Sequence, residues 1–192
     1  MNTAFSFQPR PTRTTLAEQI YALLSDDPWV FICIGSDRST GDAFGPLVGS
    51  ELLRYFPDIP VYGTLDEPVH ALNLSSVLEH ISTAHPKARM FAIDAALGEQ
   101  AMLGRLHVDT GPVFPGRGVQ KNLPAVGDAH LTAVVNQAGW LPFWMLQNTR
   151  LSHVLKLARH AAGAIALAWA RHQLTFVPDK TPLSEQASYP SS

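Results

Sequence analysis

The chain has 192 residues, enough for one domain with a sizeable core that needs no disulfides or structural metals. Only 16% of the residues are charged and the formal net charge is −2, so no net field favours nucleic acid or an anionic membrane surface. The one cysteine, Cys33, lies inside an apolar run, which excludes a disulfide framework and is typical of a reducing compartment.

The ends of the chain are polar and carry no apolar segment of signal-peptide or membrane-spanning length. We therefore expect a cytoplasmic protein. Residues 1–13 predict a flexible arm, residues 14–177 a single α/β domain and residues 178–192 a flexible tail. The domain begins with a predicted helix from Thr14 to about Ser25.

The first strand, loop and helix follow one another directly. The run from Trp29 to Ile34 is continuously apolar and of strand length, which indicates a strand buried on both faces. Gly35 ends that strand, and a polar loop over residues 35–42 leads into an amphipathic helix that ends at Pro57.

Strands and helices continue to alternate. We expect a strand over 61–65, a helix from Glu67-Pro68 to Pro86, a strand over 89–93, strands over 106–108 and 129–135, and a helix capped by Asn148 or Thr149 that runs to about Leu174. The Gly- and Pro-rich stretch from Asp109 to Gly127 predicts a long irregular excursion. This order indicates a mainly parallel sheet covered by helices on both faces.

Two aspartates follow predicted strands. Asp42 precedes the first helix after a strand, and Asp94 follows the strand over 89–93. Ligands of open α/β sheets bind at the carboxyl ends of strands, and two close carboxylates in a dry cleft divide into an acid and a base. The alternatives are that Asp42 only caps the helix and that Asp94 only orders a loop.

The loop over 35–42 allows two further interpretations. Asp37 is either a third carboxylate of the site or a solvated residue that pairs with Arg38. The glycines and hydroxyls of the loop resemble an anion cradle before a helix. The loop lacks the Gly-Lys-Ser/Thr ending of a P-loop, however, and the acid at position 42 disfavours phosphate.

Further polar residues stand near other strand ends. Asp66, Glu67 and His70 follow one strand, and Asp128 and His130 flank the start of another. Carboxylate and imidazole groups can bind zinc or manganese, although the spacing matches no strong metal signature. The alternative for both histidines is a structural, hydrogen-bonded role.

The excursion contains the triplet Asp109-Thr110-Gly111, which is also found in pepsin-like proteases. Those enzymes are all-β, so the alternating pattern excludes their fold. Arg117 and Lys121 in the same excursion either bind substrate carbonyls or carboxylates over the crevice, or belong to a solvated surface loop.

Three segments together resemble the YyaC-type sporulation proteins. They are Ile34-Gly-Ser-Asp-Arg-Ser-Thr-Gly-Asp-Ala-Phe-Gly-Pro-Leu-Val-Gly49, Gly63-Thr-Leu-Asp-Glu-Pro-Val-His-Ala71 and Leu146-Gln-Asn-Thr-Arg-Leu151. Thr64 of the second segment is expected to bind the substrate, and so are Asp37, Asp66, Glu67, His70 and Asp128. Asp42-Ala-Phe-Gly-Pro46, Ile93-Asp-Ala-Ala96 and the segment from Asp109 to Val119 also resemble segments of the germination protease of bacterial spores, which degrades small acid-soluble spore proteins.

The resemblance implies a three-layer α/β/α sandwich of phosphorylase/hydrolase type, with Asp42 and Asp94 as catalytic carboxylates. A more distant likeness to hydrogenase maturation endopeptidases implies a divalent metal such as zinc, held by Asp42, Asp94 and a later histidine, for which His130 is the candidate. We therefore expect a sporulation-associated endopeptidase whose substrates are proteins or peptides, small acid-soluble spore proteins among them. The alternatives are a non-catalytic partner-binding protein and an anion or nucleotide binder, and the oligomeric state stays open.

Overall fold

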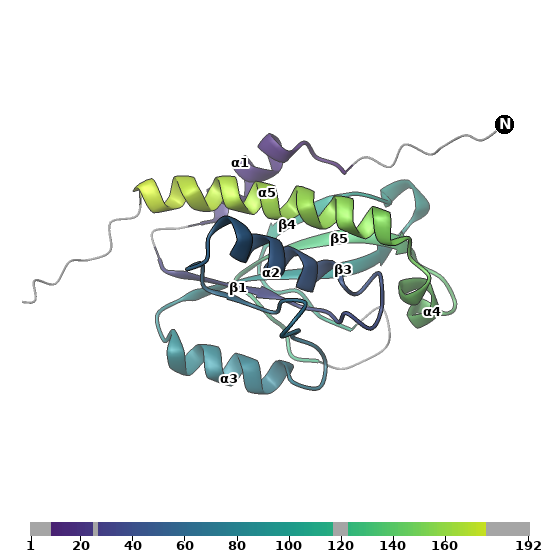
Figure 1. The fold of residues 1–192 in the computed structure, drawn as a ribbon, viewed down its shortest axis with the longest axis horizontal. Coiled ribbons are helices and arrows are strands. Elements are labelled where there is room, and N and C mark those ends of the chain that lie inside the picture. The colour runs from purple at the N-terminus through teal and green to yellow at the C-terminus, as the bar shows by residue number, and fades with distance from the viewer. Residues whose placement is uncertain (1–8, 25–26, 117–122, 176–192) are drawn as a thin grey trace, which may run out of the picture.

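The computed structural model describes residues 9–24, 27–116 and 123–175. A five-stranded sheet lies between two helical layers (Figure 1). Helices α1 (Arg13–Leu23), α2 (Phe44–Tyr55) and α5 (Leu151–Thr175) cover one face, and α3 (Leu74–Ala84) covers part of the other. The predicted three-layer α/β sandwich is confirmed.

The sheet has the strand order β2-β1-β3-β5-β4. Its strands are β1 (Trp29–Cys33), β2 (Val61–Tyr62), β3 (Arg89–Gly98), β4 (Leu106–Thr110) and β5 (Ala129–Gln137). All neighbouring pairs are parallel except β4 and β5, which are antiparallel. The carboxyl ends of β1, β3 and β5 therefore meet at one edge of the sheet, as the sequence pattern predicts.

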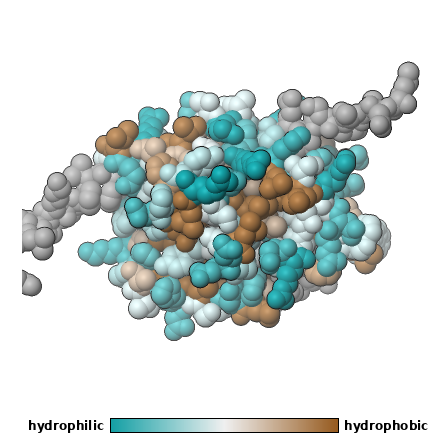
Figure 2. Space-filling view, in the orientation of Figure 1, coloured by the Kyte–Doolittle hydropathy of each residue, from teal (hydrophilic) through white to brown (hydrophobic). Residues whose placement is uncertain are grey.

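All five residues of β1 are buried, because helices pack on both of its faces. On one face, Phe31 packs its ring against those of Phe91 and Trp169. On that side α5 presents a row of small buried residues, which lets its backbone approach α1 and α2 closely (Ala158, Ala161, Ala162, Gly163, Ala164 and Ala168). In Figure 2 the outer surface over α2 and α5 mixes hydrophilic and hydrophobic residues, with one compact hydrophobic group near its centre.

The opposite face of the sheet is covered unevenly. Helix α3 packs over β1 and β3, where Ile81 and Leu74 join the buried group that contains Val30 and Ile32. Farther along the sheet, part of the excursion between β4 and β5 takes the place of a helix, since Val113 and Val126 form an isolated antiparallel bridge. A loop therefore forms the cover over this part of the sheet.

Three predicted boundaries differ from the structure by three residues or more, and several others by one or two. Strand β2 ends at Tyr62 because Gly63 turns the chain at a φ of 93°. Helix α3 begins at Leu74 and not at Glu67-Pro68, since the intervening chain turns and Val69 bridges Ile34. Strand β3 continues to Gly98, five residues beyond the predicted end at Ile93, because β5 pairs with it along this extension.

The N-terminal segment and the shorter elements complete the fold. Arg10, in the predicted arm, bridges Arg105 beside β4, and its amide donates to the Gly104 carbonyl at 3.0 Å. A 3-10 turn, η1 (Gln100–Met102), and a short helix, α4 (Pro142–Gln147), were not predicted. Within the described ranges, no helix is long and apolar enough to cross a membrane. The tail over 178–192 lies outside those ranges.

Substitution of Gly45 tests the close packing of α2 against the end of β1. A Cβ atom at this position would collide with the Ile34 carbonyl oxygen, so Gly45→Ala should destabilise the protein by about 1–3 kcal/mol through overpacking. Chemical denaturation measures this change. Gly139→Ala is the control, because the nearest heavy atom to its Cβ would be 3.9 Å away. Equal stability of the two variants would contradict the packing described here.

Candidate functional site

Strand β1 ends beside β3 at a point where β3 continues. Cys33 pairs with Ile93, and the Ile34 amide donates to the Ile93 carbonyl at 2.7 Å. Asp94 is therefore the first β3 residue beyond the pairing with β1. The loop that follows β1 folds back at this position, so that the Ser36 amide donates to the Asp42 carbonyl at 3.2 Å. Asp42 is thereby carried to the same edge of the sheet as Asp94.

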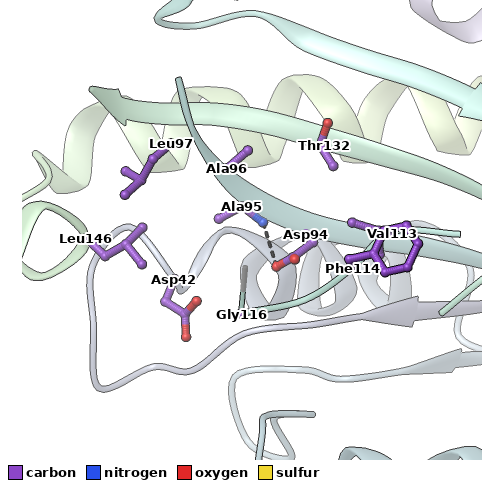
Figure 3. A pocket seen from close by; sticks show the side chains of 10 residues that line it. All are labelled: Asp42, Asp94, Ala95, Ala96, Leu97, Val113, Phe114, Gly116, Thr132 and Leu146. Carbon is purple, nitrogen blue, oxygen red and sulfur yellow. Dashed lines mark hydrogen bonds between the residues drawn. The ribbon is translucent and has the colours of Figure 1, made fainter. Parts of the chain in front are cut away.

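The two aspartates line one cavity of about 220 Å³ (Figure 3). Asp42 approaches from the loop before α2, and Asp94 from β3. Thr132 of β5 lies in register with Asp94. The other lining residues are Ala95, Ala96, Leu97, Val113, Phe114, Gly116 and Leu146. A small cavity with apolar walls thus holds two carboxyl groups and one hydroxyl.

Burial controls the charge of Asp94. Its side chain is 8% exposed, and burial, together with the negative charge of Asp42, raises its pKa well above the ordinary 3.8. The Ala95 amide donates to Asp94 Oδ1 at 2.8 Å, which opposes the rise in pKa without cancelling it. The pair therefore favours a state in which Asp94 carries a proton beside the half-buried Asp42 carboxylate.

The structural alternatives for the two aspartates receive no support. The residue that caps α2 is Ala43, and no side chain makes a capping hydrogen bond there. The hydrogen bond of Asp94 goes to the amide of the next strand residue and not to a loop. Neither helix capping nor loop ordering accounts for these two carboxyl groups.

Helix α4 forms one wall of the cavity. The Gly41 amide donates to the Leu146 carbonyl at 2.8 Å, which joins α4 to the loop that carries Asp42. Asn136, near the end of β5, donates through Nδ2 to the Met145 carbonyl at 2.8 Å. The sequence analysis missed α4 and Thr132. Pro142 followed by aromatic residues was an available helix-start signal, and Thr132 became recognisable only through its register with Asp94.

Four of the eight amides in the loop over 35–42 donate to other groups of the protein. Those of Gly35 and Ser36 donate to the carbonyls of Val69 and Asp42, the Arg38 amide to Ser36 Oγ, and the Gly41 amide to Leu146. An anion cradle needs such amides directed at its ligand. Their use within the protein weakens the interpretation of this loop as an anion or nucleotide site.

Several predicted substrate-binding residues do not line the cavity. Asp37 is exposed in the turn after β1. Thr64 accepts a hydrogen bond at Oγ1 from the Glu67 amide at 3.0 Å, in a turn that also exposes Asp66. His70 Nδ1 accepts one from the Leu72 amide at 3.3 Å. Thr64, Asp66 and His70 follow the edge strand β2, which is separated from β3 by β1.

Asp128 and Asp109 do not line the cavity: Asp128 lies toward the amino end of β5, and Asp109 pairs with His130, level with Ala92 of β3. Asp128 precedes β5, where its Oδ2 accepts from the Met90 amide at 2.8 Å and its Oδ1 lies 3.9 Å from Arg89 Nε. Asp109 Oδ1 accepts from the Thr110 amide at 2.8 Å. Because β5 is parallel to β3, a residue that precedes β5 lies toward the amino ends of both strands. Arg117 and Lys121 lie outside the described residues.

The structure does not assemble the predicted three-residue metal set. His130 donates from Nδ1 to the Gly111 carbonyl at 2.9 Å and does not line the cavity. Among the described residues, no three His, Cys, Asp or Glu side chains are grouped to hold a metal ion. Of the three predicted metal ligands, only Asp42 and Asp94 line the cavity. Cys33 is no nucleophile either, because complete burial raises the pKa of its thiol.

The fold and the site together define an α/β sandwich protein with two carboxyl groups in a cavity at the carboxyl ends of its parallel strands. Comparisons with known proteins identify its family. The chain belongs to the family described as "Protein of unknown function (DUF1256)", whose model matches residues 8–163. It is 40% identical over 175 residues to "Uncharacterized protein YyaC" of Bacillus subtilis (strain 168), covering 85% of each chain. The predicted resemblance to YyaC-type proteins is confirmed.

A solved structure shares the fold. The [NiFe] hydrogenase maturation protease HycI from Thermococcus kodakarensis KOD1 matches with a TM-score of 0.57 and 17% sequence identity, over 79% of this chain and 98% of that chain. The likeness confirms the phosphorylase/hydrolase-like fold. The likeness to the germination protease stays a prediction.

Asp94→Asn should stabilise the protein at neutral pH. Because the pKa of Asp94 is raised in the folded state, the folded protein holds this proton more tightly than the unfolded chain, and stability falls as pH rises from 3.8 to the folded pKa. Each unit of that rise costs about 1.4 kcal/mol. The gain of the variant, measured by denaturation at several pH values, should be smallest below pH 3.8. A gain that does not change with pH would contradict this account.

Asp42→Asn should lower the pKa of Asp94, because it removes the like charge that contributes to the rise. Burial remains in the variant, so the pKa should stay above its ordinary value. A carboxyl-carbon NMR titration of Asp94 in both proteins measures the difference. Identical titration curves would show that the two carboxyl groups do not interact.

Proposed function

We propose that this protein is an endopeptidase in which Asp42 and Asp94 hydrolyse a peptide bond. The observation that carries the proposal is the pairing of a buried carboxyl of raised pKa with a second carboxyl in one cavity. Perturbed carboxyl pairs in clefts are the usual acid and base of hydrolases. The fold, shared with a maturation protease, supports the same class of reaction without establishing it.

The environment of each aspartate supports a different role for it in this reaction. Asp42, the less buried of the two, acts as general base: it takes a proton from a water molecule, whose oxygen attacks the peptide carbonyl carbon. Asp94 is held protonated by burial, and it donates its proton to the nitrogen as the carbon–nitrogen bond breaks. Asp42 then holds a proton and Asp94 is ionised, and exchange with solvent restores the starting state. Thr132 stands opposite Asp94 in β5 and can donate a hydrogen bond to the carbonyl oxygen.

Three finer parts of this proposal concern biology. The family relative YyaC carries no functional description, so a role in sporulation, a cytoplasmic location and cleavage of small acid-soluble spore proteins are inferred from the motif resemblance. A non-catalytic partner-binding protein with the same cavity is the second candidate. The raised pKa of Asp94 favours the enzyme, because a carboxyl that keeps its proton can serve as a general acid.

Incubation of the purified protein with acid-soluble spore proteins, with and without a chelator, tests the proposal. We expect discrete fragments, and a loss of rate of about 10²–10⁴-fold in Asp42→Asn and Asp94→Asn, as for the removal of a general acid or base. Asp109→Asn is the matched control, since this exposed carboxylate does not line the cavity and its acceptor oxygen is retained as an amide oxygen. Both cavity variants must keep the thermal unfolding transition of a folded protein.

Intact substrate with the wild type, whether divalent metals are added or chelated, would refute the proposal for this substrate class. Fragments that form at an equal rate in Asp42→Asn, Asp94→Asn and the control would refute the carboxyl mechanism. Cleavage by the wild type that stops with chelator would show that a metal joins the two carboxylates.

A further inference from the structure

Helix α4 and the residue pair before it expose a continuous apolar surface. Trp140, Leu141, Phe143 and Trp144 are between 57% and 101% exposed. They make up four of five consecutive positions, the fifth being Pro142. We refer to these four side chains as the apolar platform. Contiguous exposed apolar residues on a protein surface usually mark a site of interaction.

The apolar platform stands on a fixed backbone. Asn136 holds the Met145 carbonyl at 2.8 Å, and Asn148 Nδ2 donates to the Trp144 carbonyl at 2.9 Å. The Gly41 amide adds a bond to the Leu146 carbonyl at 2.8 Å. These bonds fasten α4 to β5 and to the loop of Asp42. The aromatic side chains are thus presented by a braced helix, where a partner meets them at low entropic cost.

The platform is continuous with the cavity. Leu146 belongs to the same short helix and lines the space that holds Asp42 and Asp94. Phe114, which is 44% exposed, lines it as well. The volume of about 220 Å³ corresponds to roughly seven water molecules at about 30 Å³ each, so it accommodates one large side chain. A chain segment that enters the cavity beside Leu146 would pass directly onto α4.

The absence of charged residues in and around the apolar platform limits the kinds of ligand that it can bind. From Leu131 to Thr149 the sequence contains no Asp, Glu, Lys, Arg or His. The platform therefore offers no ion pair to a charged ligand, and the carboxyl pair in the cavity repels anions. Nucleic acids and phosphopeptides do not fit such a surface. A polypeptide segment with large uncharged apolar side chains does.

We propose that the apolar platform binds the polypeptide substrate through large apolar residues next to the bond to be cleaved. One such side chain occupies the cavity beside Leu146, and its neighbours pack on Phe143 and Trp144. This proposal names the substrate class for the site and rests on the proposed function for cleavage, while the binding step can be measured without turnover. Aromatic side chains of this kind dominate the binding energy of many interfaces.

Binding is tested with the Asp94→Asn protein, which removes the acid and keeps the platform. Two fluorescently labelled peptides of equal length are compared by anisotropy: one alternates Leu or Phe with Ser, and in the other Gln replaces each Leu and Phe. We expect the apolar peptide to bind at least about tenfold more tightly. Phe143→Ser combined with Trp144→Ser should weaken its binding by about tenfold or more.

Leu174→Ser is the matched control. Leu174 is 86% exposed and lies near the far end of α5, about 35 Å along that helix from Leu151 at 1.5 Å per residue. Binding should be unchanged in this variant. Because the three substituted side chains are exposed, all variants should keep the unfolding midpoint of the parent protein within the ordinary scatter of surface substitutions.

Equal affinity for the two peptides, or unchanged affinity in the double variant, would overturn the proposal. A wild-type dimer in sedimentation equilibrium that the double variant dissociates, with no peptide bound, would assign the platform to a second copy of this chain and overturn it too. Peptide binding without cleavage by the wild type would count against the carboxyl chemistry alone. Cleavage with no preference for apolar residues would count against the platform alone.

Discussion

The site depends on the difference in length between β1 and its neighbour β3. Strand β1 stops at Cys33 while its neighbour β3 continues to Gly98, so one side of β3 loses its partner at Asp94. The chain that leaves β1 must turn there and cross in front of the exposed edge, and it carries Asp42 with it. Had β1 continued in register, its backbone would occupy the space where the two carboxyl groups meet. The point at which β1 and β3 stop pairing therefore also determines where the two acids lie.

That constraint explains how the sequence could indicate both acids. The buried strand from Trp29 and the apolar run before Asp94 are unbroken patterns, and residues after parallel strands collect at one edge of the sheet. The alternation of elements likewise predicted the sandwich. Asp128 was less tractable, because it precedes a strand, and only the direction of β5 reveals that it stands at the other edge.

Other parts of the site depend on contacts between residues far apart in the sequence. Strand β3 extends because β5 pairs with it, and Thr132 faces Asp94 only through that pairing. Helix α4 has six residues, too few for a periodic signal, and tertiary hydrogen bonds from Asn136 and Gly41 hold it. His130 was a reasonable candidate ligand by residue type, yet its ring is bonded to the Gly111 carbonyl and does not line the cavity. Residue type indicated the chemistry, and packing selected among the candidates.

The cover over β5 determines how easily the shape of the cavity can change. Over β5 a loop that includes Val113 and Phe114, and not a helix, closes the cavity. A change in the length of a surface loop alters folding free energy only slowly, by about 0.6 kcal/mol for each doubling, whereas a replaced helix disturbs a whole packing layer. A change in the length of this one connection would therefore reshape the cavity at little cost in folding free energy, while the strand ends beside Asp42 and Asp94 stay in place.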